Sequence, residues 1–300
     1  MSVVLSVLIC TYNREELLPI CLSSLVEQTL DRSKYEVIVV DNNSTDNTRR
    51  IAESFAAKYD NFRVVLENKQ GLSHARNCWR EAKGEFVAYL DDDAKASPEW
   101  CERVVQAFKT VSPQPAAVGG EIRPFYETSP PAWFTEDFEL RTWGAAAAFL
   151  APPRARYGFS GSNMAFPKAV LEQFGGFSAD FGQVGYRTRL GEDTEFFFRV
   201  YETHPWFWYD PAIVVFHWTP RRNMKLSYRV LRNFRNGESI ASIEKRRILS
   251  VPYLACLLAT GYLIAATPFF LIARRNFLQR AVKRSEELAG KLGYLLARVP

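Results

Sequence analysis

The sequence is poor in the cysteine patterns that mark secreted or zinc-stabilised domains. Its 300 residues include five cysteines: Cys10, Cys21, Cys78, Cys101 and Cys256. None of them has the spacing of a zinc site or of a disulfide framework. We therefore expect reduced, mostly buried thiols in a cytosolic domain. The short apolar stretch near the N-terminus lacks a basic lead-in, so we do not expect a secretory signal there.

Motifs of several other enzyme classes are also missing. The chain contains no Walker-type phosphate loop and no GxGxxG, HExxH or GxSxG sequence, which argues against the corresponding classes. It has no low-complexity tract and no repeat, since its 16 glycines and 16 prolines are spread along the chain. Hydrophobic residues make up 47% and charged residues 24%, which is typical of a globular chain with at least one sizeable core.

The first third of the chain alternates short apolar runs with segments of helical periodicity. Four strands are predicted at Val3–Cys10, Tyr35–Val40, Phe62–Leu66 and Phe86–Leu90. Helices are predicted over Glu15–Gln28, from the turn at Asp41–Thr45 to about Tyr59, and over Gly71–Lys83. Apolar strands that alternate with helices indicate a mainly parallel, Rossmann-like α/β sheet with helices on both faces.

The rest of the chain is less regular. We expect a long loop over Pro124–Pro153, a strand over Phe159–Phe166 and a pair of strands at Trp206–Tyr209 and Ala212–Trp218. Helical segments are expected at Glu192–Glu202, at Lys225–Arg247, which is basic, and at Arg274–Pro300.

Polar clusters follow three of the predicted strands. They are Thr11-Tyr12-Asn13-Arg14, Asp41-Asn42 and Asp91-Asp92-Asp93. Ligands of such sheets bind beyond the carboxyl ends of the strands, so these clusters are expected on one edge. Taken alone, Asp41 and residues 11–14 also fit ordinary turns in which side chains bond their own backbone.

The acidic run at Asp91, Asp92 and Asp93 is the sharpest local feature. Three neighbouring carboxylates repel one another unless a cation or hydrogen bonds offset their charge. Mg²⁺ or Mn²⁺ would supply that offset, since both prefer hard oxygen ligands. Alternation along an extended chain sends Asp91 and Asp93 to the same side. A solvated acidic loop at the start of a helix explains the run equally well.

Three further features have both a chemical and a structural explanation. Glu192 and Asp193 open a predicted helix, where acids commonly interact with the helix dipole, but either could serve as a general base. His217 ends an apolar strand and is either a structural residue or a ligand. Gly161-Ser162-Asn163 interrupts a predicted strand, as a bulge or as backbone approaching a ligand.

The C-terminal region contains a long uncharged run. Residues 249–273 carry no charge and are flanked by Arg and Lys on both sides. A run of this length is long enough to cross a bilayer core of roughly 30 Å. It could be one span, a shallow hairpin or a buried helix, and we expect membrane contact. The basic residues nearby favour anionic lipid headgroups over nucleic acid. We predict a catalytic domain over 1–222 and a membrane-associated helical region over 223–300.

Taken in order, these motifs resemble glycosyltransferase family 2, the inverting enzymes of the GT-A fold. The similarity extends over roughly residues 3–220. The motifs that carry it are Ser6–Arg14, Val39–Asp46, Gly71–Asn77, Leu90–Asp93, Gly161–Phe166 and Gly191–Asp193.

The resemblance implies a role for each matching residue. Those implied to hold the nucleotide sugar are Thr11, Tyr12, Asn13, Arg14, Asp41, Arg76, Asp91, Asp92 and Asn163. Those implied to bind Mn²⁺ or Mg²⁺ are Asp91 and Asp93, with His217 completing the site. The implied catalytic base is Asp193, with Glu192 beside it.

The family mechanism is a single displacement. Asp193 would deprotonate an acceptor hydroxyl, which attacks the anomeric carbon opposite the departing nucleotide. The implied partners are a nucleotide sugar, by default a UDP-sugar, and a glycan or lipid-linked acceptor. The chain lacks the Gln-x-x-Arg-Trp motif of polymer synthases, which favours a non-processive enzyme that adds one sugar. From the uncharged run 249–273, we expect the protein at the cytoplasmic face of the cell membrane. The alternatives are a sugar nucleotidyltransferase, which would need a glycine-rich N-terminal loop, and an inactive, membrane-associated scaffold.

Overall fold

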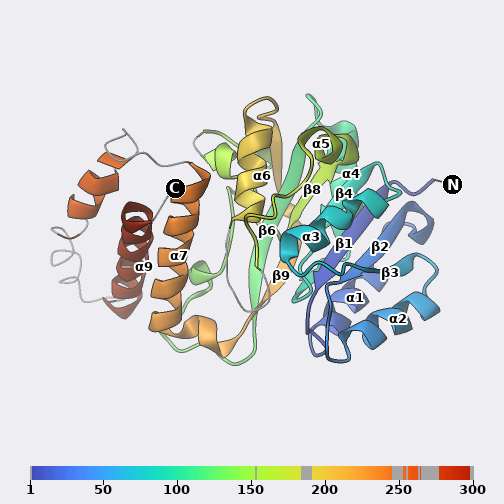
Figure 1. The fold of residues 1–300 in the computed structure, drawn as a ribbon, viewed down its shortest axis with the longest axis horizontal. Coiled ribbons are helices and arrows are strands. Elements are labelled where there is room, and N and C mark those ends of the chain that lie inside the picture. Colours follow the sequence, from blue (N-terminus) through green and yellow to red (C-terminus); the bar gives the residue numbers. More distant parts are fainter. Residues whose placement is uncertain are drawn as a thin grey trace. The chain divides into compact units, whose positions relative to one another are not determined.

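The computed structural model describes residues 2–152, 154–183, 191–244, 253–254, 256–262, 264 and 277–297. The chain forms two compact units (Figure 1). The first unit comprises residues 1–125, 139–188 and 192–218, and the second comprises 126–138, 189–191 and 219–300. The predicted domain boundary after residue 222 stays a prediction, and the second unit also includes the distant segment 126–138.

The first unit is built on a nine-stranded mixed sheet in the order β3-β2-β1-β4-β8-β6-β9-β5, with β7 paired to β9. The strands are β1 (Leu5–Thr11), β2 (Tyr35–Asp41), β3 (Phe62–Leu66), β4 (Phe86–Tyr89), β5 (Ala94–Ala96), β6 (Ala117–Tyr126), β7 (Ala148–Phe149), β8 (Met164–Pro167) and β9 (Phe207–Thr219). β1 to β4 are mutually parallel. β8 runs antiparallel to β4 and β6, and β5 and β7 run antiparallel to β9.

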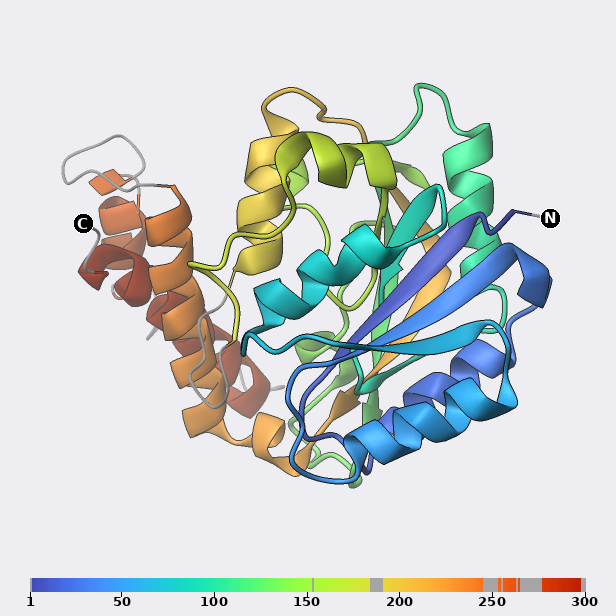
Figure 2. The same ribbon diagram turned by 45° about the vertical axis from the view of Figure 1, so that its right-hand side comes forward.

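Helices cover both faces of this sheet (Figure 2). They are α1 (Leu18–Val26), α2 (Thr48–Lys58), α3 (Leu72–Arg76), α4 (Trp100–Thr110), α5 (Lys168–Phe174) and α6 (Glu192–Tyr201). Side chains alternate between the faces along each strand. Val7 and Ile9 therefore pack into a core with α1 and α4, whereas Leu8 packs into a second core with α3, α5 and α6. Both faces of β1 are buried, which explains why the strand is apolar apart from Ser6 and Thr11.

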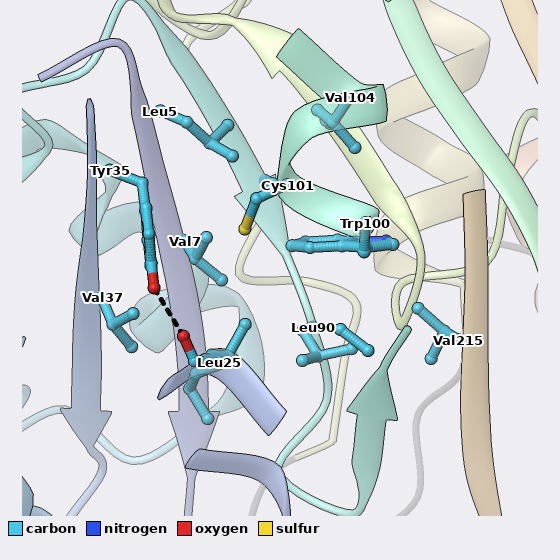
Figure 3. Close-up of a cluster of buried hydrophobic side chains, with 14 of the residues drawn as sticks. Leu5, Val7, Leu25, Tyr35, Val37, Leu90, Trp100, Cys101, Val104 and Val215 are labelled. Atoms are coloured by element: carbon cyan, nitrogen blue, oxygen red, sulfur yellow. Dashed lines mark hydrogen bonds between the residues drawn. The ribbon is translucent and has the colours of Figure 1, made fainter. Parts of the chain in front are cut away.

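Figure 3 shows the core beneath α1 and α4. Trp100 and Cys101 of α4 lie among strand residues such as Val7 and Val215. The hydroxyl of Tyr35 donates a hydrogen bond to the carbonyl oxygen of Leu25, 2.7 Å away. This bond satisfies the one polar atom of a fully buried tyrosine and ties the end of α1 to β2.

The four N-terminal strands and their parallel arrangement are confirmed. Two later predictions were wrong. Trp206–Tyr209 and Ala212–Trp218 are not paired strands but parts of one long strand, β9, because Asp210 and Pro211 continue it rather than turning. The predicted strand over Phe159–Phe166 is shortened to β8, because the amide of Asn163 donates to the carbonyl oxygen of Ser160 and closes a turn there.

The second unit contains a closely packed pair of helices, α7 (Leu226–Ile243) and α9 (Phe277–Leu296). A Cβ added at Gly237 would lie 1.9 Å from the carbonyl oxygen of Gly290, and one at Gly293 would lie 1.9 Å from that of Phe234. Glycine lets the two backbones touch at these points. Arg229 of α7 is also buried, and it forms an ion pair with Glu286 of α9.

Within the parts of the chain that the structure describes, no helix is both long and apolar enough to cross a membrane. Most of the apolar run 249–273 lies outside the described residues. Those of its residues that are described between 253 and 264 are helical and expose Leu257 (48%), Leu258 (76%), Tyr262 (66%) and Ile264 (57%).

Candidate active site

A group of three metal-ligand side chains lies where β4 ends and β5 pairs with β9. Asp91, Asp93 and His217 each offer one ligand atom, and these atoms lie within 4.8 Å of one another. The register of the antiparallel pair places His217 opposite Ala94. The amide of Trp218 also donates to the carbonyl oxygen of Asp93, 2.9 Å away. Backbone pairing therefore brings the histidine beside the acidic run.

The imidazole of His217 is oriented by its own strand. Its Nδ1 donates to the carbonyl oxygen of Trp218 at 3.1 Å, which leaves Nε2 facing Asp91 at 3.5 Å and Asp93 at 3.3 Å. Burial alone would lower the pKa of His217, but the two carboxylates outweigh it and raise the pKa. Burial would likewise raise the pKa of Asp91, but the hydrogen bond to His217 and the charge of Arg76 lower it.

Asp92 is not part of this group and is paired with Arg14. Residues 91–94 form a turn in which the amide of Ala94 donates to the carbonyl oxygen of Asp91 at 3.0 Å, so the expected alternation of an extended chain is not what groups Asp91 with Asp93. Nε of Arg14 lies 3.3 Å from Asp92, and Nη2 lies 3.5 Å from Asp93. Burial, with the neighbouring charge of Asp93, raises the pKa of Asp92 to about 7, and Arg14 opposes this shift. Arg14 thus offsets part of the repulsion within the acidic run, and Asp92 is only 7% exposed, which does not fit a solvated loop.

The loops after β1 and β2 are fastened to each other. Asn13 adopts a left-handed conformation with φ of 52°. The backbone amide of Asn13 donates to Oγ of Ser44 at 3.1 Å, and Oδ1 of Asn13 accepts a hydrogen bond from the backbone amide of Thr45 at 2.8 Å. Asp41 is 3% exposed and accepts the amide of Ser44 at 3.0 Å. The turn roles of Asn13 and Asp41 are therefore observed, while nucleotide binding by these residues stays a prediction.

Thr11 and Tyr12 occupy the same stretch at the end of β1. Thr11 is 2% exposed, and Tyr12 is half-buried. The parallel pairing of β1 with β2 sets Thr11 directly beside Asp41. Residues from two neighbouring strand ends are thus brought together at one edge, as the fold class predicts.

Arg76 and Glu192 form a buried ion pair next to the acidic run. Nη1 of Arg76 lies 2.5 Å from Glu192, and Nη2 lies 3.7 Å from Asp91. Arg76 is 3% exposed and Glu192 is 6% exposed. Burial raises the pKa of Glu192 to about 7, although the charge of Arg76 opposes the shift. The first residue of α6 is therefore connected to the end of β4 through one guanidinium.

Asp193 is held by backbone donors on both carboxylate oxygens. Oδ2 accepts the amide of Gly161 at 2.9 Å, and Oδ1 accepts the amide of Thr194 at 2.7 Å. Such bonds fix the orientation of the carboxylate. Oδ1 also accepts Oγ1 of Thr194 at 3.3 Å, so Oδ2 is the oxygen whose second lone pair can accept a proton.

Asn163 is engaged in the core rather than at an open surface. It is 1% exposed. Its side-chain nitrogen donates to the carbonyl oxygens of Glu121 at 3.1 Å and Ile213 at 2.9 Å, and its side-chain oxygen accepts Nε1 of Trp100 at 2.9 Å. These partners use both of its donors, so the structure gives Asn163 a packing role. Its implied contact with the donor sugar stays a prediction.

Sequence reasoning missed Arg141. Its charge adds to the lowering of the pKa of Asp91 and opposes the rise in the pKa of His217. It forms a β-bridge with Ile122 and a hydrogen bond from its guanidinium to Oγ of Ser160. A lone arginine in an irregular, aromatic segment carries no signal in the sequence, because its position depends on this distant bridge.

The donor set of Asp91, Asp93 and His217 fits a divalent cation. Two carboxylates and one imidazole nitrogen suit Mn²⁺, which accepts mixed oxygen and nitrogen ligands, and are compatible with Mg²⁺. The hydrogen bond from Nδ1 of His217 to a carbonyl is the support that metal-binding histidines commonly have.

The first unit is thus a mixed α/β sheet whose group of two carboxylates and one histidine lies at the carboxyl edge of the parallel strands, where ligands of such sheets bind. The model of glycosyl transferase family 2 matches residues 6–175, which is more than half of the chain. The protein belongs to this family and is a glycosyltransferase.

Two relatives illustrate the match. The succinoglycan biosynthesis protein ExoM of Rhizobium meliloti is 28% identical over 298 residues, covering 95% of this chain and 92% of ExoM. The glucosyl-dolichyl phosphate glucuronosyltransferase of Haloferax volcanii is 29% identical over 200 residues, covering 66% of this chain and 63% of the relative.

Solved structures share the fold. The mannosyltransferase PcManGT of Pyrobaculum calidifontis, in complex with GDP-Man and Mn²⁺, aligns with a TM-score of 0.61 and 19% identity, covering 95% of this chain and 86% of that one. TarS of S. aureus in complex with UDP aligns with a TM-score of 0.58 and 17% identity, covering 97% and 90%. The GT-A type of mixed α/β sheet is thereby confirmed.

Proposed function

We propose that this protein is an inverting, metal-dependent glycosyltransferase that moves one sugar from a nucleotide-sugar donor to a glycan or lipid-linked acceptor. The observation that carries the proposal is the grouping of Asp91, Asp93 and His217 within 4.8 Å. Arg76 connects this group to the segment that holds Asp193. A cation site for a diphosphate and an oriented carboxylate base are the two parts that the reaction needs.

Each part of the site has a chemical task in this proposal. Asp91, Asp93 and His217 would hold Mn²⁺ or Mg²⁺, which neutralises charge on the departing diphosphate when bound. Asp193, oriented by the amides of Gly161 and Thr194, takes the proton from the acceptor hydroxyl. The hydroxyl oxygen forms its bond to the anomeric carbon as the bond to the diphosphate breaks, so that one in-line step inverts the configuration.

The relatives support the substrate classes. ExoM is named for succinoglycan biosynthesis, and the archaeal relative is named for transfer to a sugar on dolichyl phosphate. We therefore propose an acceptor in polysaccharide or lipid-linked oligosaccharide synthesis. UDP and GDP-Man in the related structures support a nucleoside diphosphate sugar, and we take a UDP-sugar as the first donor to test.

We also propose that the protein works at the cytoplasmic face of the cell membrane. The support is the uncharged run 249–273 between basic residues, together with the exposed Leu258 and Tyr262. Replacing Leu257 and Leu258 by glutamate should reduce flotation with vesicles that contain anionic lipid. Leu66→Glu, which changes an exposed leucine at the end of β3, is the control. Equal flotation of both variants would contradict membrane docking by this run.

The enzymatic proposal is tested by measuring turnover of a panel of nucleotide sugars with Mn²⁺, with Mg²⁺ and with a chelator. Asp93→Asn should lower metal-stimulated turnover by about 100-fold or more, because one charged metal ligand is lost. Asp60→Asn is the matched control, since Asp60 is an exposed aspartate. Turnover that is equal in chelator, or equal in Asp93→Asn, would refute metal dependence. A product that retains the donor's anomeric configuration would refute inversion.

A further inference from the structure

The guanidinium of Arg76 makes its contacts with other side chains of the protein. One nitrogen contacts Glu192 at 2.5 Å, and another contacts Asp91 at 3.7 Å. The face of the group lies over the ring of Phe177, 5.5 Å from the centroid. The backbone carbonyl of Arg76 accepts the hydroxyl of Tyr89 at 3.1 Å. With 3% of the residue exposed, little of this cation is left to meet a ligand.

Gly161 makes room for this arrangement. A Cβ at Gly161 would lie 2.0 Å from Nη2 of Arg76, far inside any allowed contact. The amide of the same glycine donates to Asp193 at 2.9 Å. Gly161 is therefore the point where the arginine and the carboxylate next to Glu192 are both held. The turn between Ser160 and Asn163 brings the backbone to this position.

A guanidinium differs from an ammonium in that its nitrogens are held in a rigid plane. It can bond two carboxylates at a fixed separation, which a lysine cannot do. Here Glu192, which begins α6, is hydrogen-bonded to the guanidinium, and Asp91, which follows β4, forms a longer ion pair with it at 3.7 Å. Rigid spacing between a metal-site carboxylate and the base-bearing helix governs how donor and acceptor meet, and small displacements at such sites reduce rates strongly.

We propose that Arg76 is a positioning residue that sets the distance between the metal site and the catalytic base, and is not a ligand of the donor phosphates. In this proposal the absent side chain of Gly161 leaves the space that the guanidinium of Arg76 occupies. The inference rests on the proposed function, because it assigns the base to Asp193. It differs from the role that the family resemblance implies for Arg76. It also makes Gly161 a residue whose missing side chain serves the reaction.

The test separates catalysis from donor binding. Arg76→Lys keeps the positive charge but loses the planar guanidinium. Gly161→Ala displaces the guanidinium, and Glu192→Gln removes the negative charge of one of its two partners. For each full-length variant, kcat and KM are measured, together with the affinity for UDP or GDP in Mn²⁺, whichever the wild type binds. Arg80→Lys is the matched control, since Arg80 is exposed and bonds backbone carbonyl oxygens at Asn77 and Gly175.

Each of the three variants should lose about tenfold or more in kcat, while affinity for the nucleoside diphosphate stays within about twofold. Gly161→Ala should add little to the loss in an Arg76→Lys background, since both act on the same group. Arg80→Lys should match the wild type. Circular dichroism and thermal unfolding verify that each variant is folded.

Two results would overturn the inference. Arg76→Lys could weaken nucleotide affinity tenfold at unchanged kcat, which is the behaviour of a donor ligand. Alternatively, the losses from Arg76→Lys and Gly161→Ala could multiply, which would mean that the glycine does not act through the arginine. Both outcomes require an active wild type. Absence of transfer by the wild type with every nucleotide sugar would instead refute the proposed function.

Discussion

A methyl group added at Gly293 has no room between α7 and α9. Its Cβ would lie 1.9 Å from the carbonyl oxygen of Phe234, about 1.5 Å short of the 3.4 Å at which ordinary contact begins. The obstacle is backbone, so the helices themselves must move apart. Overpacking of this kind typically costs about 1–3 kcal/mol, and the gain from replacing a helical glycine with alanine is about 1 kcal/mol. The difference leaves a net loss of about 0–2 kcal/mol, and we expect Gly293→Ala to destabilise the second unit by roughly 1 kcal/mol.

Gly290 provides a control on the same helix. A Cβ there would approach nothing closer than the carbonyl oxygen of Asn233 at 3.5 Å, which is an ordinary contact. Gly290→Ala should therefore stabilise α9 by about 0.5–1 kcal/mol. Urea denaturation combined with hydrogen exchange of the amides of α7 and α9 measures both effects. If both variants shift stability in the same direction, the close approach of the two backbones at Gly293 is refuted.

Two further predictions concern the first unit. Asn163→Ala leaves Nε1 of Trp100 and two carbonyl oxygens without their partner, so the free energy of unfolding should fall by about 2–4 kcal/mol. An unchanged urea midpoint would refute its packing role. The pKa of Asp92 is about 7 in the folded chain, against an ordinary value of 3.8. Between these pH values the folded chain keeps a proton that the unfolded chain releases. This group therefore lowers the free energy of unfolding as the pH rises from about 4 to about 7. In chelator, Asp92→Asn should unfold like the wild type near pH 4 and be more stable by on the order of 2 kcal/mol at pH 8; a gain at pH 4 as large as that at pH 8 would contradict the assignment.

The sequence predicted the parallel half of the sheet because its strands are buried on both faces. β-branched residues such as Val37 and Val39 serve one core while Ile38 and Val40 serve the other. The resulting apolar runs are long enough to recognise and end in polar residues. The same reasoning missed β6, where Gly119 and Gly120 interrupt the apolar pattern. Their absent side chains leave space for the ring of Phe159 and for Ile213, a requirement that becomes visible only when the neighbouring segments are known.

Some residues of the candidate site could likewise be predicted from the sequence, and others could not. Asp91 and Asp93 do lie together, but the alternation of an extended chain from which this was predicted is not the reason, because residues 91–94 form a turn. His217 could be placed beside them only through the family resemblance, because its position depends on the register between β5 and β9. The contacts of Arg76 could not be predicted either, because they depend on how distant segments pack together. The sequence shows the charge of an arginine but not which residues surround it in the fold. Arg76 is buried against Glu192 and Gly161, which belong to segments far apart in the sequence.

The presence of two separate cores has a consequence for altering this enzyme. Adjacent residues of β1, such as Val7 and Leu8, contribute to packing on opposite sides of the sheet. Substitutions that share no contacts usually have additive effects on stability. A library of replacements on the α1 and α4 side could therefore be selected first, a second library on the α5 and α6 side afterwards, and the best members combined with little need to search the pairs.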